Sequence, residues 1–404
     1  MNRFYGLDSL MATFGLTNSE SFQAYQKSVL SGLESEAANL VGFEWDAPQI
    51  DFTYEQLEVE NQIGVMAQYV DVNSPALPTG KNANILKLTG SIPRQKYSIV
   101  RGENDYRKEL IALNQVKAVA TYQNKSEAEG VNEYLAKTLF NTLADLPNAH
   151  KNALNYQVGQ FKSKGKLVLN EQNNPLGGVR TTFDAQVPAK NFSSKAWFTK
   201  SGGAYTEKSG SNPVADIRAL IADIKWKKAN GYREVCVEIN EKFAYELFNH
   251  SAVAKELGYA MAGTTLRVNA ANDSGAVAVA QGATFDAKKE AFKNLIGATE
   301  VIYNATICGV ETINKSAKKW ERTAVDAFEE GVILVRPVGN IGVIKNVVPL
   351  RPDGAAITAG IYEGRGMIEY VYNAETRTQT WRSELTALAV LTRPSDMYYI
   401  NGIA

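Results

Sequence analysis

The sequence contains few cysteines, few histidines and no excess of either charge. Its 404 residues include two cysteines, Cys236 and Cys308, and two histidines. Two cysteines are too few for a disulfide-stabilised scaffold and are typical of a protein in the reducing cytoplasm. The 43 Lys and Arg residues balance the 43 Asp and Glu residues, so bulk charge predicts neither a nucleic-acid binder nor a membrane binder. Neutrality also removes the repulsion that keeps copies of a protein apart.

Long apolar runs are missing as well. No stretch approaches the roughly 18 consecutive apolar residues of a membrane span, and the N-terminus lacks the apolar core of a signal peptide. We therefore expect no membrane contact and no secretion. With 45% hydrophobic and 21% charged residues, the chain is typical of a soluble protein with two or three domains and an ample core.

The motifs of common chemistries are absent too. There is no H-E-x-x-H, no paired C-x-x-C, no EF-hand spacing, no G-x-x-x-x-G-K-[ST], no G-x-G-x-x-G after a strand and no G-x-S-x-G. His150 and His250 occur in unrelated contexts, which favours surface or helix-end positions. Cys236 alternates with strand residues, as a small core side chain would. We expect no catalytic, cofactor-binding or metal-binding residues, and the sequence does not indicate an enzyme.

The longest helical pattern runs from Asn124 to Lys164. Ser126 and Glu129 have the spacing of a capping box, and apolar residues recur every three to four positions after it. About 38 helical residues would reach roughly 57 Å at about 1.5 Å per residue. Pro147 interrupts this pattern because it cannot donate a hydrogen bond and clashes with the preceding turn. Either one helix is kinked there, or Asp145 caps a second helix with Pro147 in its first turn.

The chain before this helix lacks the apolar content of an independent domain. Residues 1–48 have two short amphipathic stretches interrupted by glycines. We interpret them as an N-terminal arm that lies on another surface; the alternative is a helical hairpin packed on the chain's own body. Residues 49–122 contain the strand-like runs 63–66 and 85–88, separated by prolines, which predict an extended hairpin. Its charged end would be either a solvated tip or a loop that makes salt bridges with another copy of the chain. The candidate contact residues are Arg94, Lys96, Arg101, Glu103, Asp105, Arg107 and Lys108.

After the long helix, residues 166–187 predict a hairpin, and the glycines in 201–203 and 209–211 predict a domain boundary. From Asn212, which can cap a helix begun by Pro213, the pattern becomes α/β. Further elements are expected at 234–239, 241–248, 251–257, a helix capped by Asp286, 301–303, 332–335, 341–348, 367–372 and 384–391.

The order of these parts is arm, long hairpin loop, long helix, hairpin, α/β domain and a return of strands. The closing stretch 381–400 reads WRSELTALAVLTRPSDMYYI, with a turn at Arg393 and Pro394, and 248–253 reads FNHSAV. These features resemble the HK97-like fold of tailed-phage major capsid proteins: its last peripheral strand, its Arg-Pro turn and its return to the axial domain. The resemblance implies an α+β fold with an N-terminal arm, an extended β loop (E-loop), a peripheral domain with a long spine helix, and an α/β axial domain. The implied ranges are 1–48 for the arm, 49–122 for the loop, 123–211 with 361–392 for the peripheral domain, and 212–360 with 393–404 for the axial domain.

The resemblance also implies a function. The chain would assemble with copies of itself into hexamers and pentamers of an icosahedral shell around double-stranded phage DNA, which it would contact non-specifically. A separate scaffolding protein, a portal and a decoration protein would be its other partners, and Pro147 would be a hinge in the spine helix. No cofactor and no membrane are implied. The shell would assemble in the cytoplasm of the host bacterium and become part of the virion.

Two other classes stay open. One is a different structural protein, such as a nanocompartment shell or a tail component. A tail tube would lack the long helix, whereas a compartment shell would share the fold and be distinguished by its cargo. The other is an α/β enzyme within 212–360, which a pocket with paired, perturbed carboxylates would favour.

Overall fold

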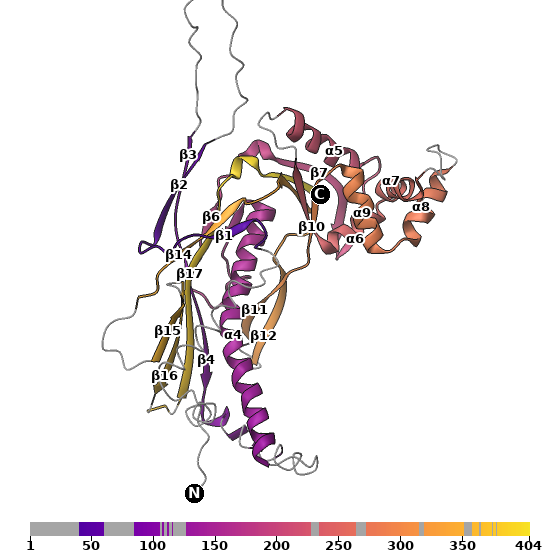
Figure 1. The fold of residues 1–404 in the computed structure, drawn as a ribbon. Coiled ribbons are helices and arrows are strands. Elements are labelled where there is room, and N and C mark those ends of the chain that lie inside the picture. Colours follow the sequence, from indigo (N-terminus) through magenta and orange to yellow (C-terminus); the bar gives the residue numbers. More distant parts are fainter. Residues whose placement is uncertain are drawn as a thin grey trace, which may run out of the picture.

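The chain is built on two six-stranded sheets and one long helix (Figure 1). The structure, a computed structural model, describes residues 40–59, 85–105, 107–108, 111–112, 115, 127–227, 234–263, 272–314, 319–350, 358–362, 365–373, 375–376 and 378–404. The first sheet lies along the long helix, and the second lies at the end of that helix and carries the shorter helices. Strands and helices are thus combined, as expected of an α+β protein.

The long helix, α4 (Glu127–Lys164), is a single 38-residue element with Pro147 inside it. A second helix capped by Asp145 is therefore wrong. Tertiary packing explains why the helix continues, because Leu146, Leu154 and Val158 are almost completely buried around and after the proline. The free energy gained by burying these side chains exceeds the cost of the one backbone hydrogen bond that the proline cannot make. Ser126, half of the predicted capping box, lies outside the described residues.

The first sheet is organised by one long strand. The 14-residue β17 (Thr378–Leu391) pairs with β16 along one edge, and with β4 and then β14 along the other. In the first half of β17, alternate residues such as Trp381 and Ser383 are buried, as a half-covered sheet requires, and from Leu385 to Leu391 every residue is buried. The other strands are β1 (Phe43–Trp45), β4 (Arg94–Arg101), β14 (Gly342–Val347), β15 (Thr358–Tyr362) and β16 (Gly366–Asn373).

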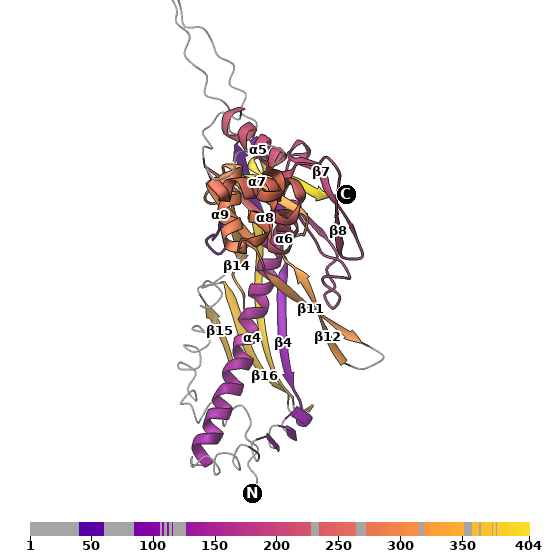
Figure 2. The same ribbon diagram turned by 90° about the vertical axis from the view of Figure 1, so that its right-hand side faces the viewer.

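The second sheet has the strand order β10-β9-β13-β18-β7-β8. Its strands are β7 (Phe192–Ser201), β8 (Ala204–Glu207), β9 (Val235–Asn240), β10 (Glu300–Asn304), β13 (Val332–Pro337) and β18 (Tyr398–Ile403). Every residue of β9 is buried. On one face, the helices that pack on this sheet form a core with Val237, Phe243 and Phe292, and on the other face Glu238 lies against Lys162 of α4. The helices are α5 (Pro213–Ala222), α6 (Glu241–Asn249), α7 (Ser251–Ala262), α8 (Asp273–Gly282) and α9 (Phe285–Ile296). Figure 2 shows them grouped beyond the end of α4.

The starts of these helices test the capping expectations. Asn212 caps α5, since its Oδ1 accepts a hydrogen bond from the Ala215 amide at 3.1 Å, and Pro213 follows as predicted. The expected cap of α9 was Asp286, which is wrong. Thr284 is the cap, and its hydroxyl accepts from the Ala287 amide at 3.4 Å. Asp286 lies in the first turn, where its negative charge interacts favourably with the positive end of the helix dipole.

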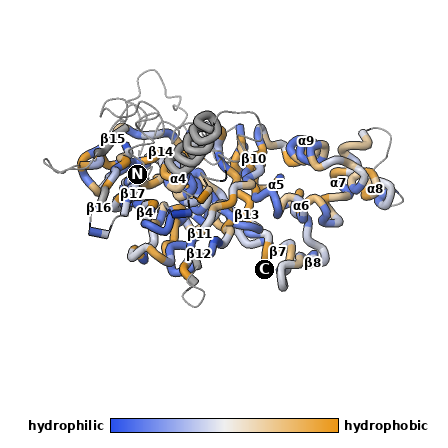
Figure 3. The backbone as a smooth tube through the Cα atoms, turned by 90° about the horizontal axis from the view of Figure 1, so that it is seen from below, coloured by the Kyte–Doolittle hydropathy of each residue, from blue (hydrophilic) through white to orange (hydrophobic). Residues whose placement is uncertain are grey.

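Three two-stranded ribbons complete the described fold. The ribbon of β5 (Lys166–Val168) and β6 (Thr182–Asp184) confirms the hairpin predicted after α4. The ribbon of β2 (Thr53–Val59) and β3 (Ile85–Ser91) projects from the body (Figure 1); the predicted run 63–66 lies outside the described residues. The ribbon of β11 (Ile307–Asn314) and β12 (Lys319–Asp326) was not predicted. Helix α4 contacts both the first sheet and β11, as the view from below shows (Figure 3).

The strands do not follow the expected boundaries between parts of the chain. Gly202 and Gly203, with φ of +54° and +89°, form the turn between β7 and β8 inside the second sheet, so the expected boundary at 211 does not separate the sheets. Strand β14 pairs in the first sheet although it lies within 212–360, and β1 pairs there although it lies within 1–48. The chain crosses between the sheets several times, and no change of composition marks those crossings.

Two glycines of the α7–α8 pair give a matched test of packing. A Cβ added at Gly258 would lie 1.8 Å from the carbonyl oxygen of Ala276, whereas one added at Gly275 would meet nothing within 4 Å. We expect Gly258→Ala to lower the free energy of unfolding by about 1–3 kcal/mol and Gly275→Ala to raise it by about 0.5–1 kcal/mol. Chemical denaturation measures both, and equal effects would contradict the close contact of the two helices.

Candidate assembly elements and buried anchors

The predicted contact residues fall into two groups, and neither is at the tip of a hairpin. Arg94 and Lys96 lie on β4, inside the first sheet, where both pair with Glu384 of β17 at 3.1 and 3.3 Å. For 94–101, the expectation of the end of a projecting loop is wrong, because these residues form strand β4, which pairs with β17 in the first sheet. The projecting hairpin is formed by β2 and β3 instead.

The second group follows β4. Arg101 ends that strand opposite Gln379. Glu103 and Arg107 form an i,i+4 ion pair at 2.6 Å, and Asp105 accepts a hydrogen bond from the Gly102 amide at 3.1 Å. Lys108 is exposed. Exposed pairs of this kind contribute little to stability, and contact of either group with another copy of the chain stays a prediction.

The β2–β3 ribbon is exposed along much of its described length. Leu57 is 66% exposed, and the ion pair between Glu55 and Lys87 lies in solvent. Glu58, the neighbour of Leu57, is only 5% exposed, and its carboxylate accepts hydrogen bonds from Ser395. Among the described side chains of the ribbon, Leu57 is thus an open apolar residue, and Glu58, next to last in β2, is a buried carboxylate that binds Ser395.

A buried charge cluster, formed by Lys162, Glu238 and Arg336, lies where α4 meets the second sheet. The three side chains are at most 1% exposed. Glu238 on β9 accepts from Arg336 Nε on β13 at 2.6 Å and from Lys162 Nζ on α4 at 3.1 Å. Lys162 Nζ also donates to the carbonyl of Val41 at 2.7 Å, and Arg336 donates to the carbonyl of Gly339 at 3.2 Å. The cluster thus joins the helix, two strands and the segment that leads into β1.

The charge states of this cluster follow from its geometry. Burial alone would raise the pKa of Glu238, but Lys162 and Arg336 outweigh burial and hold that pKa below its ordinary value. Burial lowers the pKa of Lys162, and the nearby Glu238 opposes that change. The cluster contains two cations and one anion, so the backbone carbonyls of Val41 and Gly339 are needed to solvate the excess positive charge.

The two histidines are buried rather than exposed. His250 lies at a helix end, as expected: its Nδ1 accepts from the Ala252 amide at the start of α7. His150 lies within α4, where its Nε2 is 2.9 Å from the Ser383 hydroxyl of β17. Burial lowers the pKa of His150 to about 4, so the ring is neutral at physiological pH. It links the helix to the first sheet and has no role at the surface.

The enzyme alternative requires a pocket with paired, perturbed carboxylates, so the surface depressions test it. The larger groove lies between the end of α4, β7, β12 and the C-terminus, and its carboxylates are engaged by lysines. Glu329 pairs with Lys164 at 2.8 Å, and Glu330 pairs with Lys200. Burial alone would raise the pKa of Glu330, but hydrogen bonds from Lys200 and Tyr205 outweigh it and hold that pKa below its ordinary value. Ionised, paired carboxylates are poor general acids.

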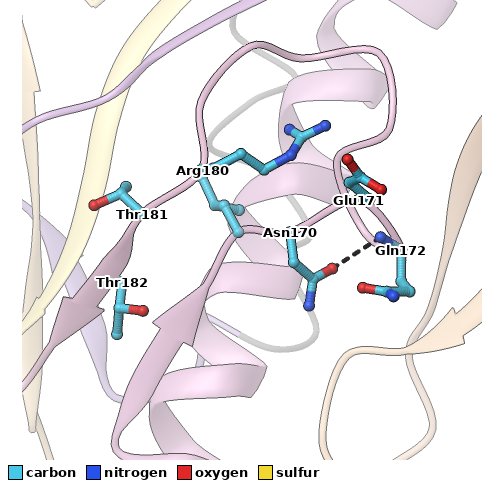
Figure 4. A pocket seen from close by; sticks show the side chains of 7 residues that line it. Asn170, Glu171, Gln172, Arg180, Thr181 and Thr182 are labelled. Carbon is cyan, nitrogen blue, oxygen red and sulfur yellow. Dashed lines mark hydrogen bonds between the residues drawn. The ribbon is translucent and has the colours of Figure 1, made fainter.

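A shallower depression lies between the turn at Asn170 and the strand after Arg180 (Figure 4). Its polar groups serve the loop itself, since Asn170 accepts from the Gln172 amide at 2.9 Å and Arg180 donates to the Asn174 carbonyl at 2.7 Å. Within the residues that the structure describes, no group of three or more His, Cys, Asp or Glu side chains could hold a metal ion. None of the helices there is both long and apolar enough to cross a membrane.

The backbone is similar to those of solved capsid structures. The capsid of Ralstonia phage GP4 is 14% identical with a TM-score of 0.42, over 89% of this chain and 85% of that chain. The capsid of the empty GTA particle is 9% identical with a TM-score of 0.41, over 91% of each chain. The capsid of Cyanophage P-SCSP1u is 10% identical with a TM-score of 0.40, over 90% and 87%. No protein-family model matches the sequence, and no curated protein sequence matches it.

The charge cluster predicts an order of destabilisation. Glu238→Gln would leave two buried cations without their anion and should cost about 3–5 kcal/mol of unfolding free energy. Lys162→Met leaves the Glu238–Arg336 pair intact and should cost less. Lys164→Met, which removes an exposed pair on the same helix, should cost under about 1 kcal/mol. Denaturant titration ranks the three, and a Glu238→Gln effect no larger than that of Lys164→Met would contradict the cluster.

His150 predicts a dependence of stability on pH. Its pKa is lowered to about 4 in the folded state from about 6.5 when unfolded, so the unfolded chain binds more protons between these values. Stability should therefore fall as pH drops from about 6.5 to 4, by up to about 3 kcal/mol for this residue. His150→Gln should show a shallower loss in denaturation series across that range. An unchanged slope in this variant would show that other groups cause the dependence.

Proposed function

We propose that this chain is the major capsid protein of a tailed bacteriophage. Copies would assemble into hexamers and pentamers that form an icosahedral shell around double-stranded DNA. The observation that carries the proposal is the combination of a long helix on a long sheet, a compact second sheet at the end of that helix, and a ribbon that projects from the body (Figure 1). In this arrangement, extended parts reach beyond the subunit's own core, where they can contact neighbours.

Each part of the fold has its own proposed role in assembly. The second sheet with α5–α9 is proposed as the axial domain, whose heterologous contacts would close into rings. The first sheet with α4 is proposed as the peripheral domain, and Pro147 as the hinge that takes up strain when the shell expands. The β2–β3 ribbon and the N-terminal arm would add many modest contacts to neighbouring copies. The proposed contact residues stay those of the sequence analysis: Arg94, Lys96, Arg101, Glu103, Asp105, Arg107 and Lys108.

The surroundings of the subunit follow from the same proposal. A scaffolding protein, a portal and a decoration protein would be its partners during assembly in the bacterial cytoplasm, and the finished shell would be part of the virion. Contact with packaged DNA would be non-specific, in line with the balance of 43 basic and 43 acidic residues. Catalysis is not part of this proposal: in the larger groove, the carboxylates of Glu329 and Glu330 are ion-paired.

Electron microscopy of the protein expressed alone, combined with size-exclusion chromatography, tests the proposal. Shells, rings of subunits or irregular tubes are expected, because the subunit carries its own ring-closing and extended contacts. A monomer or dimer that stays unchanged with concentration, salt and a co-expressed scaffold candidate would overturn the capsid function. Shells that contain a specific protein cargo and no nucleic acid would favour the nanocompartment alternative.

The exposed ribbon provides a variant with a control. Leu57→Asp places a charge on a side chain that is 66% exposed, so the subunit should fold as before while shells become several-fold fewer or fail to close. Leu176→Asp changes a leucine that is 55% exposed in a loop far along the chain and should assemble normally. Particle counts on micrographs, at equal amounts of soluble protein, compare the two. Equal assembly would show that the ribbon does not contribute.

A further inference from the structure

One connector between the two sheets is the turn that contains Arg393 and Pro394. Strand β17 of the first sheet ends at Leu391, and β18 of the second sheet begins at Tyr398. Between them, Pro394–Asp396 form a single turn of 3₁₀ helix. Both neighbouring strands lie in the middle of their sheets. A change of angle between the sheets therefore acts on this turn, as it does on the shorter link 338–341 between β13 and β14.

The projecting ribbon holds the connector from one side. Glu58 on β2 accepts hydrogen bonds from the amide of Ser395 at 3.1 Å and from its hydroxyl at 3.2 Å. These residues are 337 positions apart in the sequence. Glu58 is 5% exposed whereas its neighbour Leu57 is 66% exposed. A buried carboxylate with two such bonds is a stronger and more directional contact than a surface pair.

The second sheet holds the connector from the other side. Asn191, just before β7, donates from Nδ2 to the carbonyls of Ser395 at 2.8 Å and Met397 at 3.0 Å. The base of the ribbon also touches the first sheet, where the Arg94 guanidinium lies 5.4 Å above the ring of Phe52. Ser395 is therefore bonded to the ribbon through its donors and to the second sheet through its acceptor.

We propose that the Glu58–Ser395 contact couples the direction of the β2–β3 ribbon to the angle between the two sheets. The ribbon pairs with no other strand among the described residues, so its side-chain contacts, with Phe52 before β2 and Glu58 near the end of β2, set the direction in which it leaves the body. When the connector turns, the donors of Ser395 turn with it and carry Glu58 along. The consequence for a shell rests on the proposed function: a change of subunit shape would redirect the ribbon toward its neighbour.

Spin-label distances in the unassembled, full-length subunit test the coupling. Labels at Leu57→Cys on the ribbon and Thr206→Cys on β8 report the direction of the ribbon relative to the second sheet. Both positions are exposed, and the native Cys236 and Cys308 are buried. We expect Glu58→Gln to shift or broaden the distance distribution and Ser395→Ala, which removes one of the two bonds, to do so less. Glu55→Gln, an exposed glutamate on the same strand, should leave it unchanged.

The rate of amide hydrogen exchange at Ser395 is a second test of the coupling. Without the charged acceptor, the Ser395 amide should exchange about 10- to 100-fold faster in Glu58→Gln, while amides in the middle of β9 keep their protection. Unchanged distances in Glu58→Gln would overturn the coupling, as would equal acceleration at every amide, which indicates global loss of stability. If Glu58→Gln does not fold, Ser395→Ala decides in the same way. Since none of these measurements involves assembly, their failure is distinct from the absence of shells.

Discussion

The buried charge cluster is the interaction on which the arrangement of α4 against the second sheet depends. Removing three charges from water is costly, and the cost is offset only when each group finds its partners in good geometry. Glu238 satisfies two cations that come from different parts of the fold, α4 and β13. The excess positive charge then needs the carbonyls of Val41 and Gly339. A different angle between helix and sheet would leave at least one charge without a partner.

Helix α4 is attached to the two sheets by two different kinds of contact. Its C-terminal end is fixed to the second sheet by Lys162 and by the Tyr399 hydroxyl, which donates to the Phe161 carbonyl at 2.9 Å. Its middle is attached to the first sheet by apolar packing and by neutral His150. Charged contacts demand one geometry, whereas apolar contacts tolerate small shifts. We therefore expect changes of shape to occur along the first sheet and Pro147, with the cluster unchanged.

The sequence predicted elements with strong periodicity, namely α4, the hairpin after it and the helices from Asn212 onward. It failed where the signal is small or ambiguous. Helix α8 buries alanines such as Ala276 and Ala280, whose apolar pattern is weak. Alternating charges along β4 are equally typical of an exposed hairpin, so Arg94 and Lys96 were misplaced. The cluster was missed because its members are distant in sequence, although Glu238 within a continuous apolar strand was a visible signal of a buried, paired charge.

The division between buried and exposed polar groups separates the contacts that hold the fold from the surface that is open to a partner. The charges that fix the fold, Glu238 with its two cations and Glu58 with Ser395, are hidden from solvent. The ribbons that reach outward have only two strands each, a size that is marginal without further packing. Such elements gain most from a neighbour that covers them, because the subunit's own core cannot. If the proposed assembly forms, the subunit would be more stable within it than alone, and its rigid centre would determine the direction of its contacts.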